Sequence, residues 1–193
     1  MGIKNAFAAI VTSLCIATTL AGCGGGTTED DARPPASPSG EAATGPEITA
    51  KNYSYHAPDG WADPPQRPPG FDFDSLAAEK DPGDDAFSNN VNVLRVDTKI
   101  DSVDELEEQA VKELETGGFT DLKVKDRVSI DGADGIHLSG GASMNKLEYV
   151  VEQFGILHDG SLYFVTFSFT PDVKVATREK VADSVLTTWQ WKD

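Results

Sequence analysis

Two cysteines, Cys15 and Cys23, carry the only thiols of this chain of 193 residues. Cys15 lies within an apolar stretch, whereas Cys23 directly follows the small residues Ala21 and Gly22. A cysteine sulfur is a nucleophile once it has lost its proton, and small neighbours leave it accessible to a modifying enzyme. The spacing therefore indicates covalent modification of Cys23.

The residues before Cys23 show the pattern of an export signal. The segment from Met1 to Asn5 carries Lys4 and the free amine, and the segment from Ala6 to Leu20 carries no charge. This apolar stretch is shorter than the roughly 20 residues that cross a membrane, and small residues follow it. We therefore expect residues 1–22 to be a signal peptide, and the lack of a twin arginine indicates the general secretion route.

The sequence Leu20-Ala21-Gly22-Cys23 resembles the lipobox of bacterial lipoproteins. The resemblance implies that Cys23 receives a diacylglyceryl group, that the chain is cut after Gly22, and that fatty acids such as palmitate anchor the new N-terminus. Two or more acyl chains hold a protein stably on a bilayer. We expect localisation on the extracytoplasmic face of the cell membrane, with an ordinary secretory signal as the alternative.

Cleavage and acylation would leave the mature domain without a free thiol, because Cys15 is removed with the signal peptide. Disulfides, thiolate metal sites and cysteine catalysis are therefore excluded from that domain. Its stability must come from its own hydrophobic core.

The chain is strongly acidic, with 32 Asp and Glu residues against 16 Lys and Arg residues and a net charge of −16. Nucleic acids and anionic lipid surfaces repel such a protein. We therefore expect no nucleic-acid partner and membrane contact only through the lipid anchor. We expect a monomeric soluble domain whose partner is an envelope lipid or a membrane protein.

Other chemical signatures are sparse. The three histidines, His56, His137 and His158, do not stand at metal-ligand spacing, and neither a Gly-x-Ser-x-Gly elbow nor a phosphate-binding glycine loop is present. The acidic loop from Asp81 to Asp85 lacks the alternating ligands of an EF-hand. We predict no catalytic residue, no metal and no cofactor. Gly140-Gly141 predicts a β-bulge or a place where a ligand approaches the backbone.

Three aromatic residues, Trp61, Phe71 and Phe73, flank a proline-rich loop that cannot be a helix or a central strand. Their large apolar surfaces could wall a cleft for an acyl chain, or they could fill the core. They are the candidate ligand or partner surface of the sequence.

The remaining sequence divides into a spacer and a domain. Residues 23–48 contain the modified cysteine followed by Gly, Pro, Ser, Thr and acidic residues, which predicts a disordered tether. Residues 49–193 have the aromatic and β-branched content of a single α+β domain.

The expected elements alternate short strands with two helices. Ser102 and Glu105 form a capping box that begins a helix ending at Gly117. The segments Lys146 to Leu157 and Leu162 to Thr170 form a hairpin that is apolar on both sides, so both faces of the sheet must be covered. A final helix from Asp172 to Thr188 supplies the second cover. The further expected strands are Tyr53 to Ala57, Phe87 to Val96, Leu122 to Ile130 and Ile136 to Ala142.

This order of elements, together with Pro58-Asp59-Gly60-Trp61 after the first strand, resembles the actinobacterial LpqN/LpqT-type lipoproteins. The resemblance spans Tyr53 to Trp191 and implies a Mog1p/PsbP-like fold, an αβα sandwich around a mainly antiparallel sheet. It also implies a non-enzymatic binding or accessory role in the cell envelope, in contact with cell-wall glycolipids or the machinery that moves them. The alternative is an envelope hydrolase whose carboxylates converge on a cleft that the sequence does not reveal.

Overall fold

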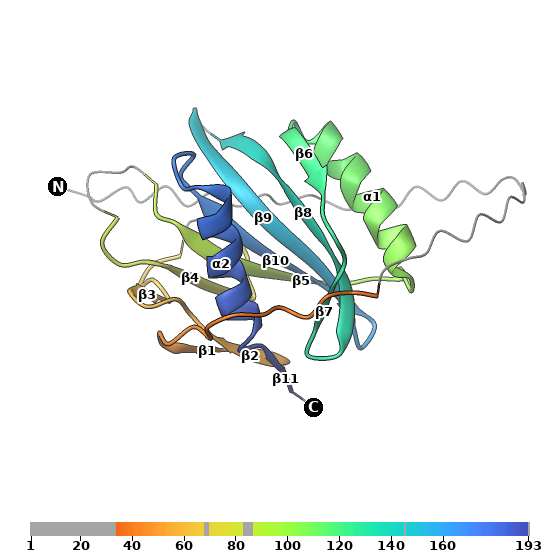
Figure 1. Cartoon of the computed structure of the whole chain (residues 1–193), viewed down its shortest axis with the longest axis horizontal. Helices are drawn as coiled ribbons and strands as arrows, with labels where there is room; N and C mark the ends of the chain where they lie inside the picture. The colour runs from red at the N-terminus through yellow and green to blue at the C-terminus, as the bar shows by residue number, and fades with distance from the viewer. Residues whose placement is uncertain (1–33, 68–69, 83–86, 145, 193) are drawn as a thin grey trace, which may run out of the picture.

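The computed structural model describes residues 34–67, 70–82, 87–144 and 146–192. Its centre is an antiparallel sheet of eight strands (Figure 1). In spatial order the strands are β3 (Trp61–Ala62), β4 (Ser75–Glu79), β5 (Asn90–Asp97), β10 (Ser161–Phe169), β9 (Leu147–His158), β8 (Ala133–Met144) and β6 (Thr120–Val124), and β7 (Val128–Ile130) also pairs with β8.

Two helices, α1 (Val103–Thr116) and α2 (Val175–Leu186), cover opposite faces of this sheet. Successive side chains of a strand point to opposite faces. In β8, Ile136 and Leu138 pack against α1, whereas His137 between them bonds Glu152, which bonds Arg178 of α2. Figure 1 shows α2 in front of β9 and β10. The predicted α+β sandwich with a helix on each face is confirmed.

The helix boundaries agree with the sequence at α1 and differ at α2. Ser102 Oγ accepts a hydrogen bond from the Glu105 amide at 3.2 Å, as the capping box predicts. The second helix begins at Val175 rather than at Asp172, so the predicted start is wrong. The Val173 amide instead bonds the Thr170 carbonyl, which forms a turn ahead of the helix.

The strands confirm the predicted hairpin, which is β9 and β10, but add elements that the sequence pattern did not predict. The expected strand from Leu122 to Ile130 is two strands, because the chain leaves β6 after Val124 and pairs with β8 again only from Val128. Strand β4 lies in a segment for which no strand was predicted.

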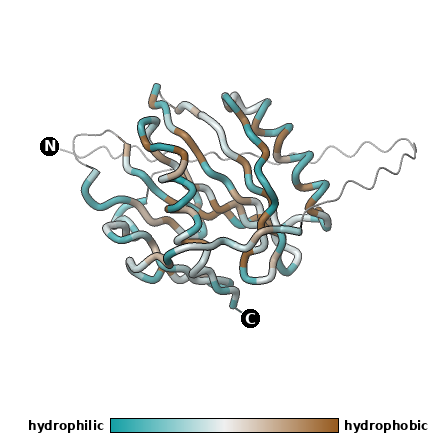
Figure 2. Tube along the Cα trace, in the orientation of Figure 1, coloured by the Kyte–Doolittle hydropathy of each residue, from teal (hydrophilic) through white to brown (hydrophobic). Residues whose placement is uncertain are grey.

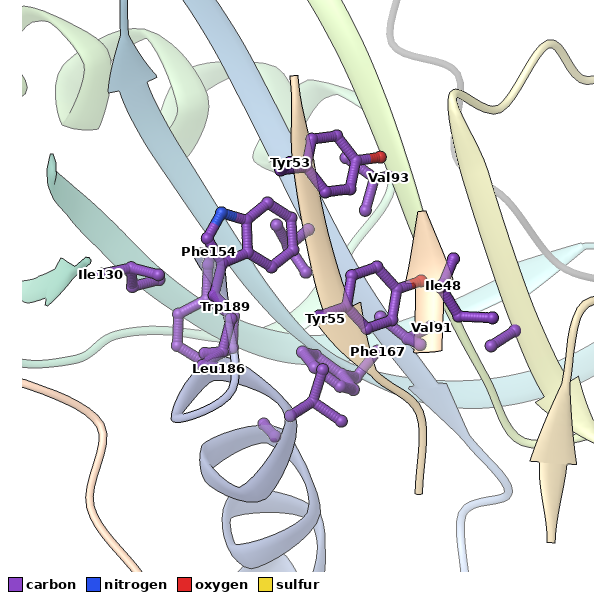
Figure 3. Close-up of a cluster of buried hydrophobic side chains, with 14 of the residues drawn as sticks. Ile48, Tyr53, Tyr55, Val91, Val93, Ile130, Phe154, Phe167, Leu186 and Trp189 are labelled. Atoms are coloured by element: carbon purple, nitrogen blue, oxygen red, sulfur yellow. The ribbon is translucent and has the colours of Figure 1, made fainter. Parts of the chain in front are cut away.

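The main core lies between the α2 face of the large sheet and a small sheet of β1 (Glu47–Thr49), β2 (Tyr53–His56) and β11 (Gln190–Trp191). Tyr53 and Tyr55 stack on Trp189, with ring centroids 4.4 and 5.4 Å apart. Figure 3 shows these three rings beside Phe154 and Leu186. The hydrophobic residues concentrate along the central strands in Figure 2, which is consistent with a sheet covered on both sides.

Residues 34–46 form a strap along the surface of the domain, below α2 in Figure 1. Ala36 exchanges backbone hydrogen bonds with Arg127 and Ser129 at β7. Further along, the Ala43 amide bonds the Ser184 carbonyl of α2, and the Gly45 amide bonds the Ala57 carbonyl. The predicted disordered tether is therefore wrong for residues 34–48, because this segment pairs its backbone with the domain and continues into β1.

Among the described residues, neither helix has the length and apolar character needed to cross a membrane.

We predict that Gly45→Ala loosens the strap. An added Cβ would lie 2.5 Å from the Ala57 carbonyl oxygen and would also clash with that of Pro58, so the backbone must move. Such overpacking destabilises a fold by about 1–3 kcal/mol. Chemical denaturation measures the loss, and Thr44→Ala at the exposed neighbouring position is the control. Equal stability of the two variants would contradict the docked strap.

We also predict that the buried tyrosines make stability fall at alkaline pH. Burial raises the pKa of Tyr53 and of Tyr55 above the ordinary value of 10, although the shared Ser75 hydroxyl opposes the shift. Unfolding releases their protons, so the stabilisation is present below pH 10 and declines as the pH rises above it. Ultraviolet titration should show phenolate forming together with unfolding. Ionisation of every tyrosine near pH 10 in the folded protein would argue against this packing.

Candidate functional site

A buried carboxylate, Glu152 of β9, is the centre of a cluster of ionisable side chains between the sheet and α2. Its side chain has no exposed surface. His137 Nε2 donates to one carboxylate oxygen at 2.9 Å, and Arg178 Nε donates to the other at 3.1 Å. Arg178 also donates from Nη1 to the Val173 carbonyl at 2.8 Å. The three ionisable side chains thus join β8, β9 and α2.

The register of β9 explains why an acid is buried there. Phe154 and Ile156 face the main core, so Glu152, two residues before Phe154, faces the same side. Burying a lone charge is costly, and the penalty is offset only by opposite charge and hydrogen bonds. His137 and Arg178 meet that need, and the His137 ring also stacks on Phe154 with centroids 4.2 Å apart.

Further charges of α2 surround this cluster. Lys125 Nζ donates to Glu179 at 2.8 Å, and this hydrogen bond lowers the pKa of Glu179. Burial raises the pKa of Asp183, while the nearby His137 opposes that shift. The first half of α2 thus makes two ion pairs, Arg178 with Glu152 and Glu179 with Lys125, whereas Val185 and Leu186 at its end enter the core.

A pocket of about 420 Å³ adjoins the cluster at the β6 edge of the sheet. Its lining mixes cations, carboxylates, hydroxyls and glycines with one aromatic ring. The residues are Gly118, Thr120, Asp121, Lys123, Ser139, Gly140, Gly141, Ala142, Ser143, Glu148, Tyr149, Val150, Pro171 and Arg178.

The strand pairings order part of this lining. Ser139 pairs with Lys123 of β6 on one side and with Glu152 of β9 on the other, so these three form one row across the sheet. Directly paired side chains stand about 5 Å apart on the same face. The next row contains Thr120 and Gly141, paired across the same strands.

Strand β6 approaches β8 closely beside Gly141. An added Cβ would lie 2.5 Å from Thr120 Oγ1. The register of β6 shifts between Thr120 and Lys123, and Asp121 within this irregularity has a φ of 52°. The glycine pair therefore lies opposite a bulge in the neighbouring strand, and Thr120 is the side chain that comes close to Gly141.

Several polar groups of the pocket are unused. Within the described part of the chain, the hydroxyls of Thr120, Ser139 and Ser143 and the Lys123 ammonium have no hydrogen bond or ion pair. The same residues contain no group of three or more His, Cys, Asp or Glu side chains arranged to hold a metal. The site can thus donate hydrogen bonds to a ligand that enters the pocket.

The three aromatic residues predicted as a ligand or partner surface do not line this pocket. Trp61 is buried in the main core, 6.3 Å from Phe169 between ring centroids. Phe71 and Phe73 stack on each other at 5.6 Å in a separate cluster with Leu76. The structure therefore does not bring Trp61 together with the other two.

The remaining sequence predictions fall in different places. Cys23 lies outside the described residues, as do residues 83–86 in the acidic loop. His56 lies within 3.0 Å of the Gly45 carbonyl in the strap, and His158 stacks on Trp191 at 4.1 Å. The sequence pattern did not predict the ion pair between Glu152 and Arg178. The sequence feature that could have indicated it is Glu152 itself, an acid at a core-facing position of the largely apolar strand β9.

The chain matches no protein-family model, and no curated protein matches it in sequence. Solved structures do match its fold. LpqN of Mycobacterium tuberculosis, described as involved in cell envelope biogenesis, superposes with a TM-score of 0.54 and 14% identity over 76% of this chain and 87% of LpqN. The likeness shows that the two share a fold.

Two other solved structures are more distant. The cyanobacterial PsbP of Synechocystis sp. PCC 6803 has a TM-score of 0.48 and 13% identity over 72% of this chain and 86% of its own. A protein of Bacteroides thetaiotaomicron VPI-5482 has a TM-score of 0.47 and 12% identity over 73% of this chain. The chain spans only 45% of the length of that protein.

We predict that Glu152→Gln destabilises the domain by about 3–5 kcal/mol, because it leaves Arg178 beside a neutral amide in a buried site. Glu148→Gln in the same strand is the matched control, since Glu148 is exposed and such surface changes stay within about 0.5 kcal/mol. Urea denaturation of both variants measures the difference. Similar unfolding midpoints would show that Glu152 does not hold α2 on the sheet.

Proposed function

We propose that this chain is a membrane-anchored, extracytoplasmic lipoprotein of LpqN/LpqT type that serves as a non-enzymatic binding or accessory module of the cell envelope. The observation that carries the proposal is the sequence Leu20-Ala21-Gly22-Cys23 ahead of a folded domain. The first described residue, Pro34, stands eleven positions after Cys23. An acylated Cys23 would therefore hold the domain beside the membrane.

The fold supports the accessory role. LpqN, which has the same fold, is described as involved in cell envelope biogenesis. The proposed partners are a cell-wall glycolipid or the membrane proteins that move such lipids. The pocket beside Arg178 supports a binding function, since its volume of about 420 Å³ is within the usual range of small-ligand sites.

A second candidate function, an envelope hydrolase, draws on the two acids in the pocket lining, Asp121 and Glu148. Both are exposed, whereas a carboxyl that acts as a general acid is usually shielded from water. The buried acid, Glu152, already uses both oxygens to accept from His137 and Arg178. We therefore favour binding over hydrolysis.

Metabolic labelling with palmitate in a bacterial host tests the anchor. The wild-type chain should incorporate label and give an acylated N-terminal Cys23 by mass spectrometry. Cys23→Ser should abolish both signals because the acceptor sulfur is gone, whereas Cys15→Ser, in the apolar part of the signal peptide, should retain them. An unmodified Cys23 in the exported wild-type protein would refute the proposed anchoring.

A further inference from the structure

The pocket beside α2 contains a cation that is held in place by the fold. Arg178 uses Nε for Glu152 and Nη1 for the Val173 carbonyl, and only 12% of its side chain is exposed. Its Nη2 group has no partner among the described residues. A guanidinium fixed in this way loses little conformational freedom when it binds a ligand.

A second cation and a hydroxyl lie in the same row of the sheet. Ser139 pairs with Lys123 on one side and Glu152 on the other, and Arg178 bonds Glu152 from α2. The two cations therefore flank Ser139. Neither Ser139 Oγ nor Lys123 Nζ has a hydrogen bond or ion pair within the part of the chain that is described.

The start of α2 adds positive potential at this end of the pocket. Its N-cap residue, Lys174, makes no side-chain capping bond, and the first turn contains no acid. Unsatisfied amides at the start of a helix carry a partial positive charge. Arg178 belongs to this first turn, and Pro171 just before the helix also lines the pocket.

One acid of the lining, Glu148, lies towards the other end. Glu148 pairs with Ser143, four residues along β8 from Ser139, which corresponds to about 13 Å along a strand. The other acid, Asp121, is exposed in the irregular part of β6, two residues before Lys123. The pocket thus has two cations and a hydroxyl around Ser139, and a separate acceptor, Glu148, farther along β8.

We propose that this pocket binds a small ligand through an oxyanion, a carboxylate or a phosphate group, held by Lys123, Ser139 and Arg178. The rest of the ligand extends along β8 and presents hydroxyl or ammonium donors to Glu148. The inference rests on the proposed binding function and names its ligand chemistry. It does not depend on the lipid anchor, because every contact lies within the folded domain.

The test uses the purified full chain with two probes, inorganic phosphate followed by phosphorus NMR line broadening and acetate followed by saturation-transfer NMR. Lys123→Gln should weaken binding of the tighter probe by at least about fivefold, because a charge-assisted hydrogen bond is lost. Lys180→Gln, an equal charge change at an exposed position of α2 outside the pocket, should change it by less than about twofold.

A second variant, Arg178→Lys, retains the positive charge but loses the forked donor geometry of the guanidinium. It should also weaken binding of the probe. Tighter binding of phosphate assigns a phosphate-bearing ligand, and tighter binding of acetate assigns a carboxylate. No binding of either probe, or equal weakening by Lys123→Gln and Lys180→Gln, would overturn the proposed site. Neither result would bear on palmitate labelling of Cys23, so the two proposals fail separately.

Discussion

The burial of one carboxylate constrains much of this structure. Glu152 has no exposed surface, so its charge needs donors that the protein itself supplies. His137 comes from the neighbouring strand, and Arg178 comes from a helix that is distant in sequence. Because both donors must reach the same carboxylate, the cluster fixes where the start of α2 lies on the sheet. The apolar contacts of Val185 and Leu186 fix its other end.

The same constraint shapes the pocket. Arg178 is oriented by Glu152, and β6 approaches β8 closely beside Gly140 and Gly141, which have no side chains there. The pocket thus lies between the start of α2, which an ion pair positions, and the edge strand β6, which pairs with β8 beside the two glycines. Its polar lining contrasts with the apolar clusters on either side of the sheet. Binding specificity here depends on hydrogen bonds and charge more than on apolar area.

The sequence predicted those parts of the fold that depend on local interactions. The Ser102 cap, the helix that follows it and the hairpin of β9 and β10 are confirmed, because capping and side-chain alternation are encoded within a few residues. The docked strap could not be predicted from composition. It is rich in Pro, Gly and Ser, and its contacts include backbone hydrogen bonds that any residue type except proline can donate.

Only part of the candidate site could be predicted from the sequence pattern. An acid at position 152, among core-facing apolar residues, indicates that a partner must exist. The identity of that partner depends on how α2 crosses the sheet, since Arg178 is 26 residues away from Glu152. Trp61, Phe71 and Phe73 illustrate the opposite problem. Their proximity in sequence suggested one surface, but Trp61 packs in the main core, whereas the two phenylalanines pack in a separate cluster with Leu76.

The strap also determines how mechanical load would enter the domain. A pull at Pro34 acts first on the two hydrogen bonds of Ala36 at β7, and only afterwards on those of Ala43 and Gly45. These contacts would open one after another while the sheet stays intact. Release of the nine residue steps from Ala36 to Gly45 would then lengthen the linker by about 30 Å, at roughly 3.4 Å per residue. If the domain is held at its N-terminal end, detachment of the strap would therefore increase the distance that the linker can span.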